Sequence, residues 1–276
     1  MSSDEVTLLI HRLLRKSLAV SAVILSVAFC ALSCTRDLPD PSDFISGSGE
    51  QDVDDTFMSW ILWNYDSDKD GSINVSEAEA VNKIELSTEN ILSLAGISNF
   101  PNLTYLHAQG IRDWDNDKNL GKLTGLDLSG NPKLQHIHLI YNNIKTLKLA
   151  ECPDLDYLCL DYNEVTELDV KGFQRLTLLQ VSYNKLKSID VSGLDELTEF
   201  HCDFNPIEKI TLANANLESF RCAGTLVKEL DFSKCPKINN VDCLECKNLT
   251  TIKLAKGQVL GNIRKEDNVK IVYGNE

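Results

Sequence analysis

The sequence lacks several features that would point to common functional classes. Basic residues are scarce, since 27 Lys and Arg stand against 41 Asp and Glu and the formal net charge is −14. A nucleic-acid partner is therefore not expected, because no basic stripe is available to neutralise phosphates. Glycine and proline are not enriched, with 14 and 7 of 276 residues. The composition is that of an acidic globular chain.

Sequence signatures of catalysis are also missing. The chain has no serine nucleophile elbow, no glycine-rich loop that would cradle a phosphate and no His-x-x-x-His pair. Paired carboxylates are confined to one acidic loop and to scattered positions. We therefore expect a binding or structural protein and not an enzyme.

Long apolar runs are missing except for one stretch near the N-terminus. Residues 17–32 carry no charge and follow a basic cluster of Arg12, Arg15 and Lys16. The stretch is shorter than the roughly 20 residues that span a membrane, and it fits the apolar region of a signal peptide. An uncleaved N-terminal anchor helix is the alternative interpretation.

The apolar stretch ends in Ala31-Leu32-Ser33-Cys34, which resembles the lipobox of bacterial lipoproteins. The resemblance implies that residues 1–33 are removed as a signal peptide and that the Cys34 thiol carries a lipid. Residues 34–53 are rich in Asp, Ser, Gly and Pro, so we expect a flexible acidic linker there. This acidic segment resembles the surface-export signals of Bacteroides lipoproteins. It implies an exported outer-membrane lipoprotein, exposed at the cell surface and attached to the membrane only by its lipid.

Residues 66–77, DSDKDGSINVSE, match the EF-hand calcium loop at every diagnostic position. The expected ligands are the carboxylates of Asp66, Asp68, Asp70 and Glu77, the backbone carbonyl of Ser72 and a water held by Asn74. Apolar residues at helical spacing on both sides favour this interpretation over a fortuitous acidic turn. A single loop in an exported protein is expected to bind Ca²⁺ weakly, with a Kd of roughly 10⁻⁴–10⁻³ M, and to stabilise structure.

The remaining sequence repeats with a period of about 21 residues. The pattern L-x-x-L-x-L-x-x-N-x-L-x-x-L-x-L begins at Leu134, Leu155, Leu176, Leu197, Leu217 and Ile238. It resembles the leucine-rich repeats of internalin-like and Bacteroides surface proteins. The resemblance implies a leucine-rich repeat solenoid, a right-handed α/β-type coil of mostly short β-strands. We expect repeats over residues 84–255, a helical EF-hand cap over 54–83 and a C-terminal cap over 256–276.

Two columns of the repeat are expected to be structural. The first contains Asn142, Asn163, Asn184 and Asn205, whose amides can bond backbone groups of their own and adjacent turns. The second contains Cys202, Cys222 and Cys243, which continue a core column of Leu and Val. The spacing of Cys243 and Cys246 is that of a zinc knuckle, but no second Cys or His pair is nearby, so we favour core positions.

The outward side chains of the strands are expected to form a concave binding face. Its candidate partner-binding residues are Tyr141, Tyr162, Tyr183, Phe204, His138, His201 and Arg221. Such rings suit contacts with a protein or stacking on a sugar, although each ring could simply cover its neighbour. We expect a monomer that binds a protein, or a glycan, at the cell surface. The alternative is a structural envelope protein whose repeats dock another envelope component, with Ca²⁺ purely stabilising.

Overall fold

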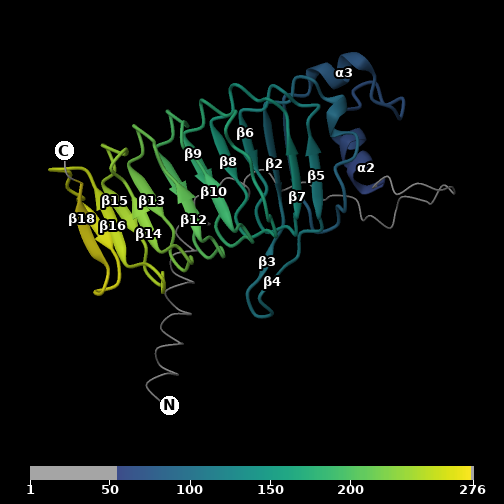
Figure 1. The fold of residues 1–276 in the computed structure, drawn as a ribbon. Helices are drawn as coiled ribbons and strands as arrows, with labels where there is room; N and C mark the ends of the chain where they lie inside the picture. Colours follow the sequence, from purple (N-terminus) through teal and green to yellow (C-terminus); the bar gives the residue numbers. More distant parts are fainter. Residues whose placement is uncertain (1–54, 275–276) are drawn as a thin grey trace. The chain divides into compact units, whose positions relative to one another are not determined.

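A computed structural model describes residues 55–274. The signal peptide, Cys34 and the linker predicted from the sequence lie outside the described residues. The described region begins with two helices, α2 (Asp55–Tyr65) and α3 (Val75–Ala80), which flank the acidic loop (Figure 1). Phe57 and Ile61 lie one helical turn apart and are fully buried, so this face holds α2 against the core.

Nine parallel strands form the main sheet, in the order β1-β2-β6-β8-β9-β11-β13-β15-β17 (Figure 1). Their bounds are β1 (Lys83–Ser87), β2 (Tyr105–Gln109), β6 (His136–His138), β8 (Tyr157–Cys159), β9 (Leu178–Gln180), β11 (Glu199–His201), β13 (Ser219–Arg221), β15 (Asn240–Asp242) and β17 (Asn262–Arg264). The register is simple, because each strand pairs with the strand one turn later at equivalent positions of the repeat. Tyr157 faces Leu178, for example, and Leu178 faces Glu199.

Shorter sheets use other parts of the same turns. Strands β5 (Gly125–Leu128) and β7 (Thr146–Leu149) pair, as do β10 (Ser188–Asp190) and β12 (Lys209–Thr211). Strands β14 (Glu229–Asp231), β16 (Thr251–Leu254) and β18 (Lys270–Tyr273) form a third parallel group. A 3₁₀ helix, Ile97–Asn99, lies between β1 and β2 in the chain.

The core consists of apolar columns that run from turn to turn. The inward-facing residues of the main-sheet strands from β1 to β15 are buried. They are Ile84 and Leu86 in β1, Leu106 and Ala108 in β2, and the middle residues of the shorter strands, Ile137, Leu158, Leu179, Phe200, Phe220 and Val241. Each such side chain contributes about 1.5–3 kcal/mol by leaving water. One turn cannot bury these groups alone, so stability comes from stacking. The described region is a leucine-rich repeat solenoid, as the sequence predicts.

The asparagine column behaves as expected from the repeat. Asn163 donates from Nδ2 to the carbonyl of Leu139 in the preceding turn at 2.7 Å and to that of Leu160 in its own turn at 3.0 Å. Its Oδ1 accepts the backbone N–H of Ile144 at 3.0 Å. Asn184 and Asn205 repeat this arrangement one and two turns later. The buried backbone of each turn is therefore satisfied by a neighbouring amide.

Two segments depart from the regular coil. Residues 112–119 form an antiparallel hairpin of β3 (Arg112–Asp113) and β4 (Lys118–Asn119). Residues 256–273, assigned to a C-terminal cap, contribute β17 and β18, which continue two sheets in parallel register. Within residues 55–274, no helix has both the length and the apolar character needed to cross a membrane.

Candidate functional site

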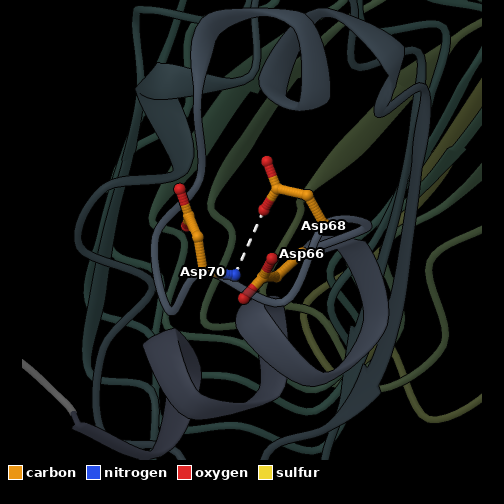
Figure 2. Close-up of side chains that lie close together, drawn as sticks. All are labelled: Asp66, Asp68 and Asp70. Atoms are coloured by element: carbon orange, nitrogen blue, oxygen red, sulfur yellow. Dashed lines mark hydrogen bonds between the residues drawn. The ribbon is translucent and has the colours of Figure 1, made fainter.

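The acidic loop gathers three carboxylates at one point. Oxygen atoms of Asp66, Asp68 and Asp70 all lie within 4.8 Å of one another (Figure 2). Backbone N–H groups hold all three of them. Gly71 donates to Asp66 Oδ2 at 2.9 Å, Asp70 to Asp68 Oδ1 at 3.1 Å, and Ser72 to Asp70 Oδ1 at 2.8 Å. Asp66 Oδ1 is buried and has no hydrogen-bond partner. A hard cation that prefers oxygen would satisfy this atom, so the residues present fit Ca²⁺.

The charges in the loop support the same conclusion. The Asp70 backbone N–H lowers the pKa of Asp68, but burial and the carboxylates of Asp70 and Glu77 outweigh it and raise that pKa overall. A carboxyl group with a raised pKa among like charges is one that a cation would help to ionise. The Ser72 hydroxyl also donates to Asp70 Oδ1, at 2.7 Å.

Glu77 does not join the three aspartates in this structure. Its Oε1 accepts the backbone N–H and the hydroxyl of Ser67, both at 2.7 Å, and its Oε2 accepts the backbone N–H of Asn74 at 3.0 Å. The Ser67 hydroxyl leads these contacts, which together lower the pKa of Glu77 to about 2. Asn74 in turn accepts the Glu77 N–H and forms the capping box of α3. Glu77 would need to exchange these partners to close a metal site.

One side chain joins the acidic loop to the solenoid. The hydroxyl of Tyr65, the residue before Asp66, donates to the backbone carbonyl of Lys83 in β1. The Lys83 ammonium lies 4.8 Å from the centroid of the Tyr105 ring and 2.6 Å from Glu85. A cavity of about 270 Å³ lies at this junction, lined by residues that include Trp60, Asn64, Asn82 and Glu85. The loop and the first strands are therefore in direct contact.

The first strands of the main sheet carry outward-facing rings in two columns. In one column the His136 ring stacks on Tyr105 at 4.5 Å and on Tyr157 at 4.0 Å between centroids, with interplanar angles of 10°. In the other column His107 and His138 stack at 4.3 Å. The faces of these rings cover one another, so the outward surface of the main sheet presents mainly ring edges here. We call these five residues the ring patch.

The histidines of the ring patch on β6 are neutral at physiological pH. Burial lowers the pKa of His136 to about 4 and that of His138 to about 3. His138 Nε2 is buried without a hydrogen-bond partner. His136 and His138 are therefore uncharged, and the unpaired His138 nitrogen lies below the surface of the patch.

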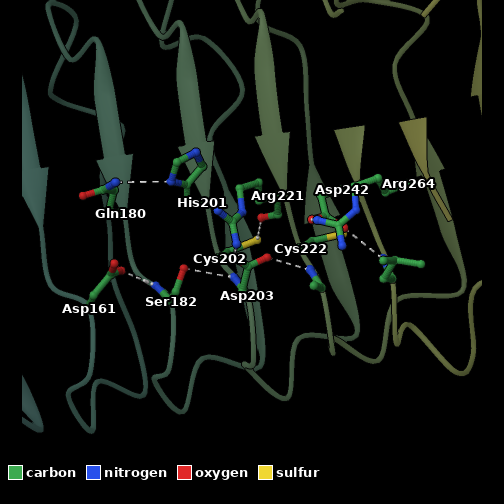
Figure 3. A network of polar contacts seen from close by, with 12 residues as sticks. Asp161, Gln180, Ser182, His201, Cys202, Asp203, Arg221, Cys222, Asp242 and Arg264 are labelled. Atoms are coloured by element: carbon green, nitrogen blue, oxygen red, sulfur yellow. Dashed lines mark hydrogen bonds and ion pairs between the residues drawn. The ribbon is translucent and has the colours of Figure 1, made fainter. Parts of the chain in front are cut away.

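The later strands of the same sheet carry charges that pair with each other. Arg221 lies 2.9 Å from Asp203, and Arg264 lies 2.7 Å from Asp242 (Figure 3). His201 contacts Gln180 at 3.2 Å, and burial lowers its pKa to about 4. The structure therefore places His138, His201 and Arg221 on the outward columns, as predicted, but in two different surroundings.

A column of short polar side chains runs beside these charges. Asp161 accepts the backbone N–H of Ser182 at 2.6 Å, Ser182 Oγ accepts that of Asp203 at 3.2 Å, and Asp203 accepts that of Ala223 at 2.7 Å (Figure 3). Burial raises the pKa of Asp161 to about 7 and, despite the adjacent Arg221 charge, that of Asp203 to about 6. Sequence reasoning missed this column, although an Asp or Ser directly precedes the aromatic residue in each of these three turns.

The four aromatic residues that precede the asparagines are not in the strands. Tyr141, Tyr162, Tyr183 and Phe204 each occupy the turn after a main-sheet strand, with φ between 53° and 57°. Their rings form a half-buried stack with centroid separations of 5.0, 4.1 and 4.6 Å. The stack ends at Gly224, because a Cβ there would lie 2.7 Å from the Phe204 ring. This geometry favours the interpretation in which each ring covers its neighbour.

The β3–β4 hairpin covers the other end of this stack. Trp114 meets Tyr141 and Tyr162 edge to face at 6.2 and 5.8 Å, and the Arg112 guanidinium lies 5.2 Å from the Tyr162 centroid. Gly110 and Gly121 close the base of the hairpin, where a Cβ on Gly110 would lie 2.5 Å from Gly121. Trp114 remains 44 % exposed. This pair of close glycines is the sequence signal that could have located the hairpin.

Comparison with known proteins adds little to this description. The sequence matches no protein-family profile and no curated protein. Similar solved structures include the functional domain of InlJ from Listeria monocytogenes, which includes a cysteine ladder, at 19 % identity and a TM-score of 0.47. That match covers 72 % of this chain but only 56 % of the InlJ domain.

Two further solved structures are similar to this chain. An internalin (inlF) of L. monocytogenes is 14 % identical with a TM-score of 0.38, covering 81 % of this chain and 96 % of that one. A leucine-rich repeat protein of Leptospira interrogans is 17 % identical with a TM-score of 0.37, covering 74 % and 71 %. At these values the fold assignment depends on the strand pairing of this chain alone.

Proposed function

We propose that this chain is an exported, calcium-stabilised binding protein that takes a protein partner on the ring patch of its concave sheet. The observation that carries the proposal is the contrast along that sheet. The ring patch consists of stacked rings in which burial keeps His136 and His138 neutral, whereas the charges on β13 to β17 already pair with each other. Binding energy at protein interfaces is concentrated in aromatic and other well-packed side chains, and exposed ion pairs contribute little.

The ring stacking favours a protein over a glycan as the partner. A sugar binds an aromatic side chain by lying against its face, and in the ring patch the faces of His136 and Tyr157 lie against each other at 4.0 Å. Ring edges, hydroxyl groups and imidazole nitrogens remain, and these suit the side chains and backbone of a protein. A protein partner would also need no positive surface on this strongly acidic chain.

Ca²⁺ is proposed to hold the first turn in place behind this surface. Asp66, Asp68 and Asp70 would hold the ion, and its positive charge would neutralise their mutual repulsion. Tyr65 connects the loop to Lys83, whose side chain lies over the Tyr105 ring. The sequence-based expectation of a lipid at Cys34 would place this module on the bacterial outer membrane, at the cell surface.

Binding experiments with matched variants test the partner site. The full chain is screened against purified extracellular proteins and, in parallel, against an oligosaccharide array. Tyr157→Ala and His136→Ala are expected to weaken binding of a protein hit by at least about tenfold. Glu199→Ala and Ser219→Ala, which lie further along the column of His136 and Tyr157, are expected to leave it unchanged. Equal affinities for all four variants, or hits only on the oligosaccharide array, would reject a protein site here.

The lipid anchor and the surface location are tested in cells. Globomycin, which blocks lipoprotein signal peptidase, should shift the precursor to lower electrophoretic mobility if Cys34 is lipidated. Protease added to intact cells should then remove the solenoid. Stoichiometric cross-linking to an endogenous envelope protein would instead favour the structural alternative, in which the repeats dock another envelope component.

A further inference from the structure

Cysteines occupy two adjoining columns in the last turns of the solenoid. Cys222 stands in the core column that follows the main-sheet strands, after Val181 and Cys202. Cys246 stands in the asparagine column, after Asn205 and Thr225. Both thiols are buried, with 0 % and 1 % of their residue surface exposed. The repeat therefore determines the positions of these two side chains relative to each other.

The geometry of the asparagine column brings the two sulfur atoms together. In regular turns the side-chain amide of the column reaches the carbonyl of the core-column residue 24 positions earlier, as Asn205 does with Val181 at 2.8 Å. Cys246 makes the equivalent contact from Sγ to the carbonyl of Cys222 at 3.0 Å. Because the residue reached is itself a cysteine, the Cys246 and Cys222 sulfurs lie only 3.9 Å apart.

The surroundings of the pair differ from those of the other cysteines. The Cys222 thiol leads the contacts that lower the pKa of Cys246 to about 7, and the Thr225 hydroxyl, 3.4 Å from Cys246 Sγ, adds to them. Burial raises the pKa of Cys222 well above its usual value. Cys152 lies in another column, where its thiol contacts the carbonyl of Asn131 at 3.5 Å and the backbone of Leu134. A thiolate next to a second thiol is the arrangement from which a disulfide forms.

We propose that Cys222 and Cys246 are a modification site, at which a disulfide joins two adjacent turns near the C-terminal end of the solenoid. The oxidant is a small-molecule or protein disulfide. The Cys246 thiolate attacks one of its sulfurs and releases one thiolate. Cys222, once deprotonated, then attacks Cys246 and releases the second. The cysteines lose two electrons and two protons, and the oxidant disulfide becomes two thiols.

Burial determines when this reaction can occur. Both sulfurs are inaccessible in the folded chain, so a disulfide reagent reaches them only while the last turns are still open. The bond is therefore formed during folding, and in an oxidising compartment. Once formed, it closes the turn between the two positions and makes opening of this end of the solenoid less favourable.

Peptide mapping after controlled refolding tests the proposal. The full chain is unfolded with reductant and refolded in either a glutathione disulfide buffer or dithiothreitol. Free thiols are then alkylated in denaturant, and each cysteine is assigned by mass. We expect a linked Cys222–Cys246 peptide only in the disulfide buffer, with Cys152 alkylated in both. Alkylation of both Cys222 and Cys246 in the disulfide buffer, or a link to a different cysteine, would overturn the proposal.

Thermal unfolding provides a second readout. The oxidised protein should melt roughly 5–10 °C above the reduced protein. Cys246→Asn restores the residue type of the regular turns and should fold while losing this redox-dependent difference. Cys152→Ser should keep it. If refolding in vitro is incomplete, the same peptide mapping is done on protein that cells have exported to an oxidising compartment. Free Cys222 and Cys246 thiols in that protein would also overturn the proposal.

Discussion

The early and late turns of this solenoid use different side chains at equivalent positions. The asparagine column carries amides from Asn142 to Asn205 and then changes to Thr225 and Cys246. The concave columns carry rings on β2, β6 and β8 and ion pairs on β13 to β17. The backbone pairing is the same in both regions. The fold therefore fixes where side chains lie, and the local choice of side chain determines what each region does.

The largest expected effect comes from removing an amide in the middle of the asparagine column. Asn184→Ala leaves the buried N–H of Val165 without a partner and removes one of the two amide donors to the Leu160 carbonyl, so we expect a loss of roughly 2–4 kcal/mol in the free energy of unfolding. Thr225→Ala removes the hydroxyl bond to the Cys222 carbonyl and a longer contact with Cys246 Sγ, and should cost about 1 kcal/mol. Denaturant titration measures both, and equal losses would show that the two regions do not differ in this column.

A substitution at the end of the aromatic stack is expected to have a smaller effect on the free energy of unfolding. Gly224 has φ 70°, and a Cβ at this position would lie 2.7 Å from the Phe204 ring. Gly224→Ala should therefore destabilise the chain by roughly 2–3 kcal/mol. Gly172 has open space around it, and Gly172→Ala should be neutral or slightly stabilising. If both substitutions were neutral in thermal unfolding, the stack would not need to end at residue 224.

Calcium is expected to stabilise the protein only at its acidic loop, beside the first turns of the solenoid. At 10 mM Ca²⁺ and the weak affinity expected of a single loop, the gain should be roughly 1.5–3 kcal/mol. Asp66→Asn should abolish this gain. Asp115→Asn, the same change in the β3–β4 hairpin, should leave it intact. Calorimetric melts with Ca²⁺ and with chelator provide the measurement. If the unsubstituted protein melted at the same temperature in both, the proposed calcium site would be rejected.

The raised pKa values of Asp161 and Asp203 predict that substituting these residues changes stability by an amount that depends on pH. The pKa of Asp161 is raised to about 7 in the folded chain. The contribution of protonated Asp161 to the free energy of unfolding is therefore complete below about pH 4, the pKa of an aspartate in the unfolded chain. This contribution is lost as the pH rises through about 7. Asp161→Asn cannot ionise, so its stability relative to the unsubstituted protein should rise between pH 5 and 8 by on the order of 2 kcal/mol. Asp203→Asn should gain less, because Arg221 already pairs with Asp203. A pH-independent difference for Asp161→Asn would refute the raised pKa.

The sequence predicts the columns of this fold well, because each follows from the repeat period. The asparagine bonds, the burial of Cys202 and the outward position of His138 all follow once the residues are aligned on the strands. The period carries no information on insertions, so the hairpin at 112–119 could not be derived from it. The alternation of Val269, Ile271 and Tyr273 with other residues predicts a closing strand, and the structure has β18 there. Strand β17 was hidden, because the leucine pattern fades after residue 254.

The direction in which side chains point within a column also could not be predicted from the sequence. The position of Tyr162 before Asn163 is periodic, but the left-handed backbone that turns its ring onto Tyr183 is a property of the turn. The calcium loop shows the same limit. Its residues match the EF-hand pattern, yet only the structure shows Glu77 bonded to Ser67 and Asn74 and placed apart from the three aspartates.

The residue-for-residue register of the main sheet has a consequence for the history of the molecule. Leu179 pairs with Phe200, and Phe200 with Phe220, so one turn presents to its successor the same pattern that it receives from its predecessor. Duplication of a DNA segment that encodes one whole turn would therefore insert a unit with matching surfaces on both sides. Loss of such a segment would rejoin compatible neighbours. Descendants of this chain can change length in steps of one turn, and the cap and the hairpin keep their places at the start of the coil.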